Sequence, residues 1–149
     1  MVNLQLTMIL NESSRLFPPV PALSRSIARD VRLGDLDLPK GVGVHMPLYV
    51  LQHDPSLWGD DYMKFKPERF AQGIAKAGNH QLALMPFSFG PRICVGHVFA
   101  MQEAKVVMAT LLRQLRFRLS PQYRHAPAMT FASLQPQHGL PLVVEKVHS

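Results

Sequence analysis

The sequence of 149 residues holds one cysteine, Cys94, and one tryptophan. A single cysteine excludes an internal disulfide and a zinc site built from several cysteines. No apolar run approaches the ~20 residues that a membrane-spanning helix needs, and the first residues do not resemble a secretory signal. The seven histidines show no paired spacing typical of a metal site. Internal repeats and low-complexity tracts are also missing, so we expect an ordinary folded domain rather than a repeat or disordered protein.

Acidic residues are scarce in the second half of the chain. Residues 1–75 hold eight Lys/Arg and eight Asp/Glu, whereas residues 76–149 hold eight and two, which gives the net charge of +6. The densest basic stretch contains four arginines: Arg113, Arg116, Arg118 and Arg124. No zinc finger, helix-turn-helix or aromatic RNA motif accompanies them, so nucleic acid is not an expected partner. The stretch is either a solvated face or a docking surface for an acidic electron-transfer protein.

The length and the 47% of apolar residues fit one domain over residues 1–149. Apolar residues at helical spacing predict a helix over Leu4–Phe17, which ends before two prolines. Two strands are predicted at 30–38 and 42–46. We expect them to form a pair, because Leu38-Pro39-Lys40-Gly41 between them suits a type I turn.

From residue 47 onward, the sequence predicts two helices, a long stretch of loops and a last strand. A short helix is expected near 47–52, and irregular loops are expected from 54 to 83. The clearest helix is 98–115, where apolar residues recur at helical spacing. A turn at 136–139 and a last strand at 140–144 complete the prediction.

The cysteine lies in Phe87-Ser-Phe-Gly90-Pro91-Arg92-Ile-Cys94-Val-Gly96, directly before the long predicted helix. A lone cysteine is usually a small buried apolar residue. Here the amide groups and dipole of a helix N-terminus, together with Arg92, favour a thiolate. The two glycines allow the backbone to approach a flat ligand, and the phenylalanines can exclude water. We therefore predict that the thiol binds haem iron.

These residues carry a resemblance to a known family. Phe87-x-x-Gly90-x-Arg92-x-Cys94-x-Gly96 resembles the cysteine-ligand loop of the cytochrome P-450 superfamily, the haem-thiolate monooxygenases. Three further segments match in the right order: Glu12-Ser-Ser-Arg15 followed by Pro18-Pro19, then Pro67-Glu68-Arg69-Phe70, and the helix after Gly96. The resemblance covers essentially the whole chain.

The resemblance implies the C-terminal portion of that fold, mainly α with small β-sheets. Its expected parts are a Glu-x-x-Arg helix, a β-hairpin, a meander, the cysteine-ligand loop, a long helix and a C-terminal hairpin. Residues 1–149 would then form a single partial domain. Looser details, such as His53-Asp54-Pro55 and the segment 135–139, resemble the plant microsomal clan that oxidises hormones and terpenoids.

For the cofactor, the resemblance implies haem b with Cys94 as the catalytic axial ligand of iron. Phe87, Gly90, Arg92 and Gly96 would surround the haem on the side of the sulfur. Arginine presents a planar fork that suits carboxylates, and haem has two propionates. Arg92 and Arg25 resemble the two arginines that bind them. The alternative for each is a solvated surface arginine.

Glu12 and Arg15 lie three residues apart on the first predicted helix, so their side chains can meet. An exposed pair would contribute little. Apolar helical neighbours indicate instead that Glu12 is buried, and a buried carboxylate needs full pairing. The resemblance implies that Arg69 joins the pair, in a structural cluster that holds the cysteine loop for haem uptake.

Two further segments resemble parts of the family that touch substrate. They contain five candidate contact residues: Val20, Ala22, Leu23, Ser133 and Leu134. Both segments are apolar, which indicates a small lipophilic substrate. Ordinary core packing is the alternative for each residue.

As a whole, the resemblance implies reductive activation of O₂ and hydroxylation of the substrate. The electrons would come from an NADPH-dependent reductase docked on the basic face. Relatives are held on the cytosolic face of the endoplasmic reticulum membrane by an N-terminal anchor, which we do not find in this chain. Also absent are the Gly-x-x-Thr helix that handles O₂ and the Trp-x-x-x-Arg helix. In addition, Ser14 replaces a leucine, and we expect modest destabilisation if that site is buried.

Two alternatives remain. The chain could be a truncated product that is catalytically inactive and at most binds haem. It could also be a hydrolase with Cys94 as nucleophile, which requires a histidine base nearby. His97 is near, but its place in the first helical turn makes that geometry unfavourable.

Overall fold

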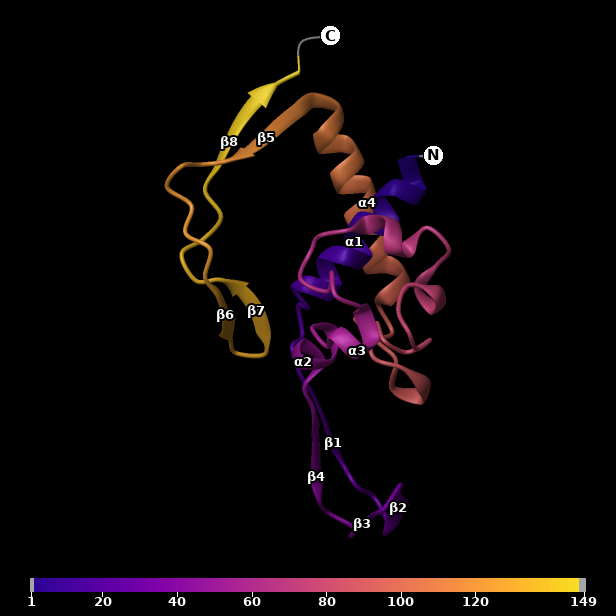
Figure 1. The fold of residues 1–149 in the computed structure, drawn as a ribbon. Coiled ribbons are helices and arrows are strands. Elements are labelled where there is room, and N and C mark those ends of the chain that lie inside the picture. Colours follow the sequence, from indigo (N-terminus) through magenta and orange to yellow (C-terminus); the bar gives the residue numbers. More distant parts are fainter. Residues whose placement is uncertain (1, 148–149) are drawn as a thin grey trace.

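The computed structural model describes residues 2–147 (Figure 1). The α-helices within this range are α1 (Val2–Leu16), α2 (Leu48–Gln52), α3 (Pro55–Trp58) and α4 (His97–Gln114). Three short 3-10 helices are η1 (Pro67–Phe70), η2 (Ile74–Lys76) and η3 (Gly90–Arg92). The strands are β1 (Leu23–Ser26), β2 (Val31–Leu33), β3 (Leu36–Leu38), β4 (Gly43–Met46), β5 (Leu115–Leu119), β6 (Pro127–Thr130), β7 (Ser133–Pro136) and β8 (Leu142–Lys146). The predicted combination of helices and small antiparallel sheets is confirmed.

The two long helices lie together at the centre of the molecule, and two arms of paired strands project from it (Figure 1). One arm carries β1 and β4, with the β2–β3 hairpin at its far end. The other carries β5 and β8, with the β6–β7 hairpin below them. All four sheets are two-stranded and antiparallel. The loops between α3 and α4 lie around the central helices.

Helix α1 confirms the first predicted helix to within two residues at each end. Leu6 and Leu16 on its apolar side are buried. The last main-chain bond runs from the Phe17 N–H to the Ser13 carbonyl oxygen at 2.8 Å, and Pro18 follows. With its amide nitrogen turned toward the helix end, the buried Gln52 donates to the carbonyls of Ser14 and Arg15 at 3.0 and 2.9 Å. These are carbonyls that no helical partner satisfies.

The predicted pairing of 30–38 with 42–46 is wrong. Residues 31–38 form a hairpin of their own, in which β2 pairs with β3. Gly34, with φ of +59°, closes its two-residue turn in a conformation that favours glycine. Strand β4 pairs instead with β1, which we did not predict because four residues after three prolines carry too short a pattern.

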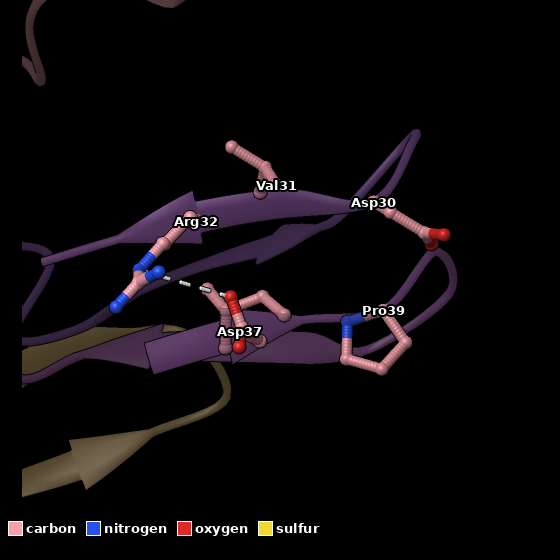
Figure 2. Close-up of a pocket in the computed structure, with 6 residues that line it drawn as sticks. Asp30, Val31, Arg32, Asp37 and Pro39 are labelled. Carbon is pink, nitrogen blue, oxygen red and sulfur yellow. Dashed lines mark ion pairs between the residues drawn. The ribbon is translucent and has the colours of Figure 1, made fainter. Parts of the chain in front are cut away.

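Figure 2 shows the β2–β3 hairpin, with Arg32 and Asp37 opposite each other on the two strands. Their charged groups lie 3.9 Å apart, and both side chains are exposed. An exposed pair of this kind contributes little to stability. Asp30 ties the open end of the hairpin, because its Oδ1 accepts the Lys40 N–H at 2.8 Å.

The small hydrophobic core lies in the loop region between α3 and α4. Trp58, Phe70, Ala83 and Leu84 are buried there together. The predicted loops from 54 to 83 are confirmed, apart from the short helices α3, η1 and η2. Gly78 is required by packing, because a Cβ on it would lie 2.9 Å from the Leu57 carbonyl oxygen. Helix α1 contacts η1, so this core is attached to the first helix.

Helix α4 confirms the predicted 98–115 helix, shifted by one residue at each end. Several of its apolar side chains are exposed, among them Phe99 at 71% and Val106 at 64%. The predicted last strand corresponds to β8 and starts two residues later than expected. Its partner β5 and the strands β6 and β7 were not predicted. The turn predicted at 136–139 is present, with the Gly139 N–H bonded to the Pro136 carbonyl.

Candidate functional site

A hollow of about 430 Å³ opens between the end of α1, the segment after it and the loop before α4. It is lined by Ser14, Pro19, Val20, Leu23, Arg25, Pro86, Phe87, Ser88, Arg92 and Cys94. Six of these were candidate site residues from the sequence. The lining is largely apolar and none of the lining residues is acidic. Gly90, Gly96 and Ala22 are neighbours in sequence but do not line the hollow.

The cysteine loop is held by short main-chain bonds. The Cys94 N–H donates to the Phe87 carbonyl oxygen at 2.9 Å, and the Ile93 N–H donates to Gly90 at 3.0 Å. Gly90 has φ of +75°, which begins the tight turn of η3. Gly96 passes close to the thiol, since a Cβ built on it would lie 4.0 Å from Sγ. Cys94 is exposed and comes two residues before the N-cap of α4.

Arg25 and Arg92 line the hollow from two separate segments. Arg25 is half-buried on β1, where it donates to the Ser24 carbonyl at 2.9 Å and to Ser88 Oγ at 3.1 Å. A guanidinium has five N–H donors, so several remain for a further acceptor. Ser88 has φ of +67°, a backbone conformation that costs a residue with a side chain about 1–2 kcal/mol. The Arg25 contact offsets part of that cost. Arg92 is exposed.

The structure brings Glu12, Arg15 and Arg69 together. Arg15 forms a two-point contact with Glu12, at 2.7 Å from Nε and 2.9 Å from Nη2. Both side chains are fully buried. Arg69 Nε lies 3.4 Å from Glu12 Oε1, an ion-pair distance without hydrogen-bond alignment. The carboxylate also accepts the Lys66 N–H at 2.8 Å, so it has several donors in its buried position.

The two arginines of this cluster also bind loop carbonyls. Arg15 donates to the carbonyls of Gln52 and Lys64 at 3.0 and 3.3 Å. Arg69 donates to the carbonyls of Trp58 and Asp61 at 3.1 and 2.6 Å. The cluster therefore joins α1, the end of α2 and two loops, in addition to neutralising a buried charge.

Asp61 extends the cluster toward the surface and was not predicted. Its carboxylate lies 2.6 Å from Arg69 Nη2 and 2.9 Å from Lys66 Nζ. Hydrogen bonds from Lys66 and then Arg69 lower the pKa of Asp61 from 3.8 to about 2. Asp61 lies in an irregular loop with no periodic pattern that could predict its role. The only sequence feature near it that pointed to the cluster is the family segment containing Arg69.

The remaining candidates lie beside the hollow. Ser133 and Leu134 begin β7, and Leu134 lines a smaller hollow of about 180 Å³ with Phe17 and His125. The Leu134 N–H donates to the Pro19 carbonyl at 2.9 Å, which joins the two predicted substrate segments. Ser14 is half-buried and lines the main hollow. We expected its hydroxyl to destabilise the fold only if the site were buried, and this condition is met only in part.

Comparison with known proteins identifies the family. The model of the family described as Cytochrome P450 matches residues 4–142. The chain belongs to the cytochrome P450 family. Similar relatives include Cytochrome P450 72A397 of Kalopanax septemlobus, 48% identical over 95% of this chain, and 11-oxo-beta-amyrin 30-oxidase of Glycyrrhiza uralensis, 50% identical over 95%. Cytochrome P450 72A11 of Arabidopsis thaliana is 48% identical over 95%. The chain spans 27–28% of the length of these relatives.

Cytochrome P450 proteins generally bind haem, and the residues of the hollow suit that group. Haem is a flat apolar ring with two carboxylates and an iron that accepts a thiolate. The lining of this cytochrome P450 chain offers one thiol, two arginines and apolar side chains, and no lining carboxylate would repel the propionates. The donor set therefore fits haem.

Arg113, Arg116 and Arg118 lie at or beyond the end of α4 that is far from Cys94. Arg124 is instead a neighbour of His125, whose ring packs on Phe17 after the end of α1. Arg113, Arg116, Arg118 and Arg124 are exposed. The two ends of α4, which has 18 residues, lie roughly 27 Å apart at 1.5 Å per residue. Arg118 is paired with Glu145 across β5 and β8. None of the helices within residues 2–147 combines the length and apolar character that crossing a bilayer requires.

Proposed function

We propose that this chain is the C-terminal, haem-ligating part of a cytochrome P450 monooxygenase, with Cys94 as the axial ligand of haem iron. The observation that supports it is the hollow in which Cys94, Arg92 and Arg25 meet. Arg25 lies far from the other two in sequence. A thiol and two guanidinium groups around an apolar space match the three chemical features of haem b.

The residues that line the hollow would hold the haem in one orientation. Arg25 and Arg92 bind the two propionates, and guanidinium–carboxylate contacts are directional as well as strong. Phe87 lines the hollow next to Cys94, and with haem bound it would help to exclude water from the sulfur. A thiolate ligand supplies electron density to iron, and the bound haem supplies the activation of O₂.

The Glu12–Arg15–Arg69 cluster has a structural role in this proposal. The loops that precede the cysteine have little regular structure, so few ladder hydrogen bonds hold them. The buried cluster binds four main-chain carbonyls, at the ends of α2 and α3 and in the loop after them, and fixes them relative to α1. It thereby holds the region from which the cysteine loop continues.

The substrate would be a small lipophilic molecule of the terpenoid class. Val20 and Leu23 line the hollow with apolar surface, and Ala22, Ser133 and Leu134 lie next to it. One similar relative is named an 11-oxo-beta-amyrin 30-oxidase. We propose hydroxylation of a substrate of comparable character.

An NADPH-dependent reductase would supply the electrons. The excess positive charge of residues 76–149 would attract an acidic partner at long range and steer it toward the exposed arginines of the basic stretch. The complete protein would work at the cytosolic face of the endoplasmic reticulum membrane, as proposed from the resemblance.

A second candidate is an inactive product that at most binds haem. The exposed apolar side chains of α4, such as Val98, Phe99 and Val106, favour it for residues 1–149 expressed alone. Exposed patches of this kind promote association. We therefore expect the 149-residue chain by itself to fold poorly and to show no turnover.

The test is a spectrum of the complete protein, reduced and bound to carbon monoxide. A thiolate-ligated haem gives a red-shifted band, and Cys94→Ala should abolish it. Val95→Ala is the matched control, since Val95 is a neighbour that is fully exposed. A wild-type protein without the band, or a Cys94→Ala variant that keeps it, overturns the assignment.

A further inference from the structure

We infer that His97 is a positioning residue that fixes the direction of the Cys94 sulfur through the Cys94 carbonyl group. This inference rests on the proposed function. The Cys94 carbonyl oxygen accepts two hydrogen bonds from the same residue. One comes from the His97 main-chain N–H at 3.3 Å, and the other from ring Nδ1 at 2.8 Å. Because a carbonyl only accepts, Nδ1 carries the proton.

The hydrogen bond from the His97 ring matters because few other contacts hold the cysteine loop where it joins α4. Cys94 precedes the N-cap residue Gly96, so its carbonyl lies outside the regular bonding of α4. The neighbouring Val95 is fully exposed. Without the ring bond, the carbonyl would keep only the longer main-chain contact at 3.3 Å.

Phe87 holds the other side of Cys94 and also contacts His97. The Cys94 N–H is bonded to the Phe87 carbonyl at 2.9 Å, and the Phe87 ring lies 6.2 Å from the His97 ring. Phe87 thus supports the cysteine through its main chain and supports His97 through its ring. With both its N–H and its C=O held, the main chain of Cys94 is fixed, and so is the direction of the Cα–Cβ bond that carries the sulfur.

This geometry also bears on the hydrolase alternative. Nδ1 of His97 is engaged by the carbonyl oxygen, and within residues 2–147 no hydrogen bond joins the ring to the thiol. A histidine that activates a cysteine nucleophile needs such a bond. The ring is placed to orient the ligand residue rather than to deprotonate it.

The experiment compares variants of the complete haem-loaded protein. His97→Phe keeps a ring beside Phe87 and removes the donor. His97→Asn removes the ring and keeps an N–H donor at the position of Nδ1. The readouts are the rate at which the reduced carbon-monoxide complex loses its red-shifted band and the reduction potential of the haem.

We expect His97→Phe to lose the band about 10-fold faster than wild type, the scale of effect for residues that orient a metal ligand. His97→Asn should stay close to wild type in both readouts. Should the phenylalanine variant not fold, His97→Ala removes the donor with a residue that favours helix.

The results that overturn the inference are distinct from those that overturn the proposed function. A donor-less variant with wild-type band stability and potential overturns the inference alone. So does a His97→Asn variant as impaired as His97→Phe, because the ring and not the donor would then be responsible. A wild-type protein without any red-shifted band overturns the proposed function, and this inference with it.

Discussion

The main-chain N–H of Leu134 donates to the carbonyl oxygen of Pro19 at 2.9 Å. This bond joins the β6–β7 hairpin near the end of the chain to the segment that follows α1. A second link lies nearby, where the rings of Phe17 and His125 meet edge to face at 5.6 Å. Tyr123 supports that ring through a 2.8 Å bond between its hydroxyl and His125 Nδ1.

Phe17→Ala should loosen this hairpin. An aromatic pair contributes about 0.5–1.5 kcal/mol beyond the area it buries. We expect faster proteolysis at the hairpin tip around Phe131, which is fully exposed. Tyr123→Phe is the control, since it removes only the hydroxyl bond to His125 and should have a smaller effect. Equal cleavage rates in wild type and Phe17→Ala would show that the ring contact does not hold the hairpin.

Glu12→Gln should strongly destabilise the protein. It leaves two arginine charges next to a neutral amide at a position where Glu12 and Arg15 are fully buried. Breaking a buried pair in this way costs about 3–5 kcal/mol. Chemical unfolding of the complete protein measures the cost. The exposed Glu68→Gln should change stability by less than about 0.5 kcal/mol, and a similar loss in both variants would contradict the special role of the cluster.

Asp61 should make stability depend on pH in the acidic range. Lys66 and Arg69 lower its pKa from 3.8 to about 2 in the folded protein. A group whose folded pKa is depressed stabilises the fold above its unfolded pKa. Its contribution is therefore present above about pH 4 and is lost as the pH falls toward 2. Unfolding of Asp61→Asn across this range should show a smaller loss than wild type, and parallel curves would refute the prediction.

Gly78→Ala should destabilise the core around Trp58. The added methyl group would lie 2.9 Å from the Leu57 carbonyl oxygen and 3.1 Å from the Ala83 Cβ. Overpacking of this kind typically costs about 1–3 kcal/mol. Gly43→Ala is a suitable control, because its nearest neighbour is 3.9 Å away. Thermal unfolding that is unchanged in Gly78→Ala would mean that the Leu57 loop adjusts easily.

Arg92→Gln should weaken haem retention, if the proposed function holds. Removing one charged donor to a propionate costs about 1.5–3 kcal/mol, which corresponds to loss of haem at least about 10-fold faster. Transfer of haem to an acceptor protein measures this rate. Arg29→Gln changes an exposed arginine outside the lining of the hollow and should leave the rate unchanged. An Arg92→Gln rate equal to wild type would contradict a propionate contact at this residue.

The long helices could be predicted because many residues at one spacing indicate the same element. The small sheets could not, because each strand is only three to five residues long. Between 30 and 46 the turn residues Gly34 and Pro39 compete, and local signals do not reveal which one closes the hairpin. The pairing is decided by β1, which lies outside the predicted segment.

The predicted site residues lie together mainly where one motif contained them. The hollow brings together Cys94, Arg92 and Phe87 from one motif, with Arg25 placed by its position in the family pattern. Asp61 and Gln52 were missed because their contacts are tertiary. Gln52 reaches the end of α1, and Asp61 reaches Arg69, and neither partner follows from spacing along the chain.

Arg15 and Arg69 bind the loops through main-chain oxygens, and every residue type supplies such an oxygen. The exposed Lys64, for example, contributes its carbonyl to Arg15 and nothing of its side chain. The loops around the cluster are therefore free to drift in sequence over evolutionary time, provided that their backbone path is kept. Two arginines can in this way maintain the conformation of the loops while the loop residues themselves are substituted.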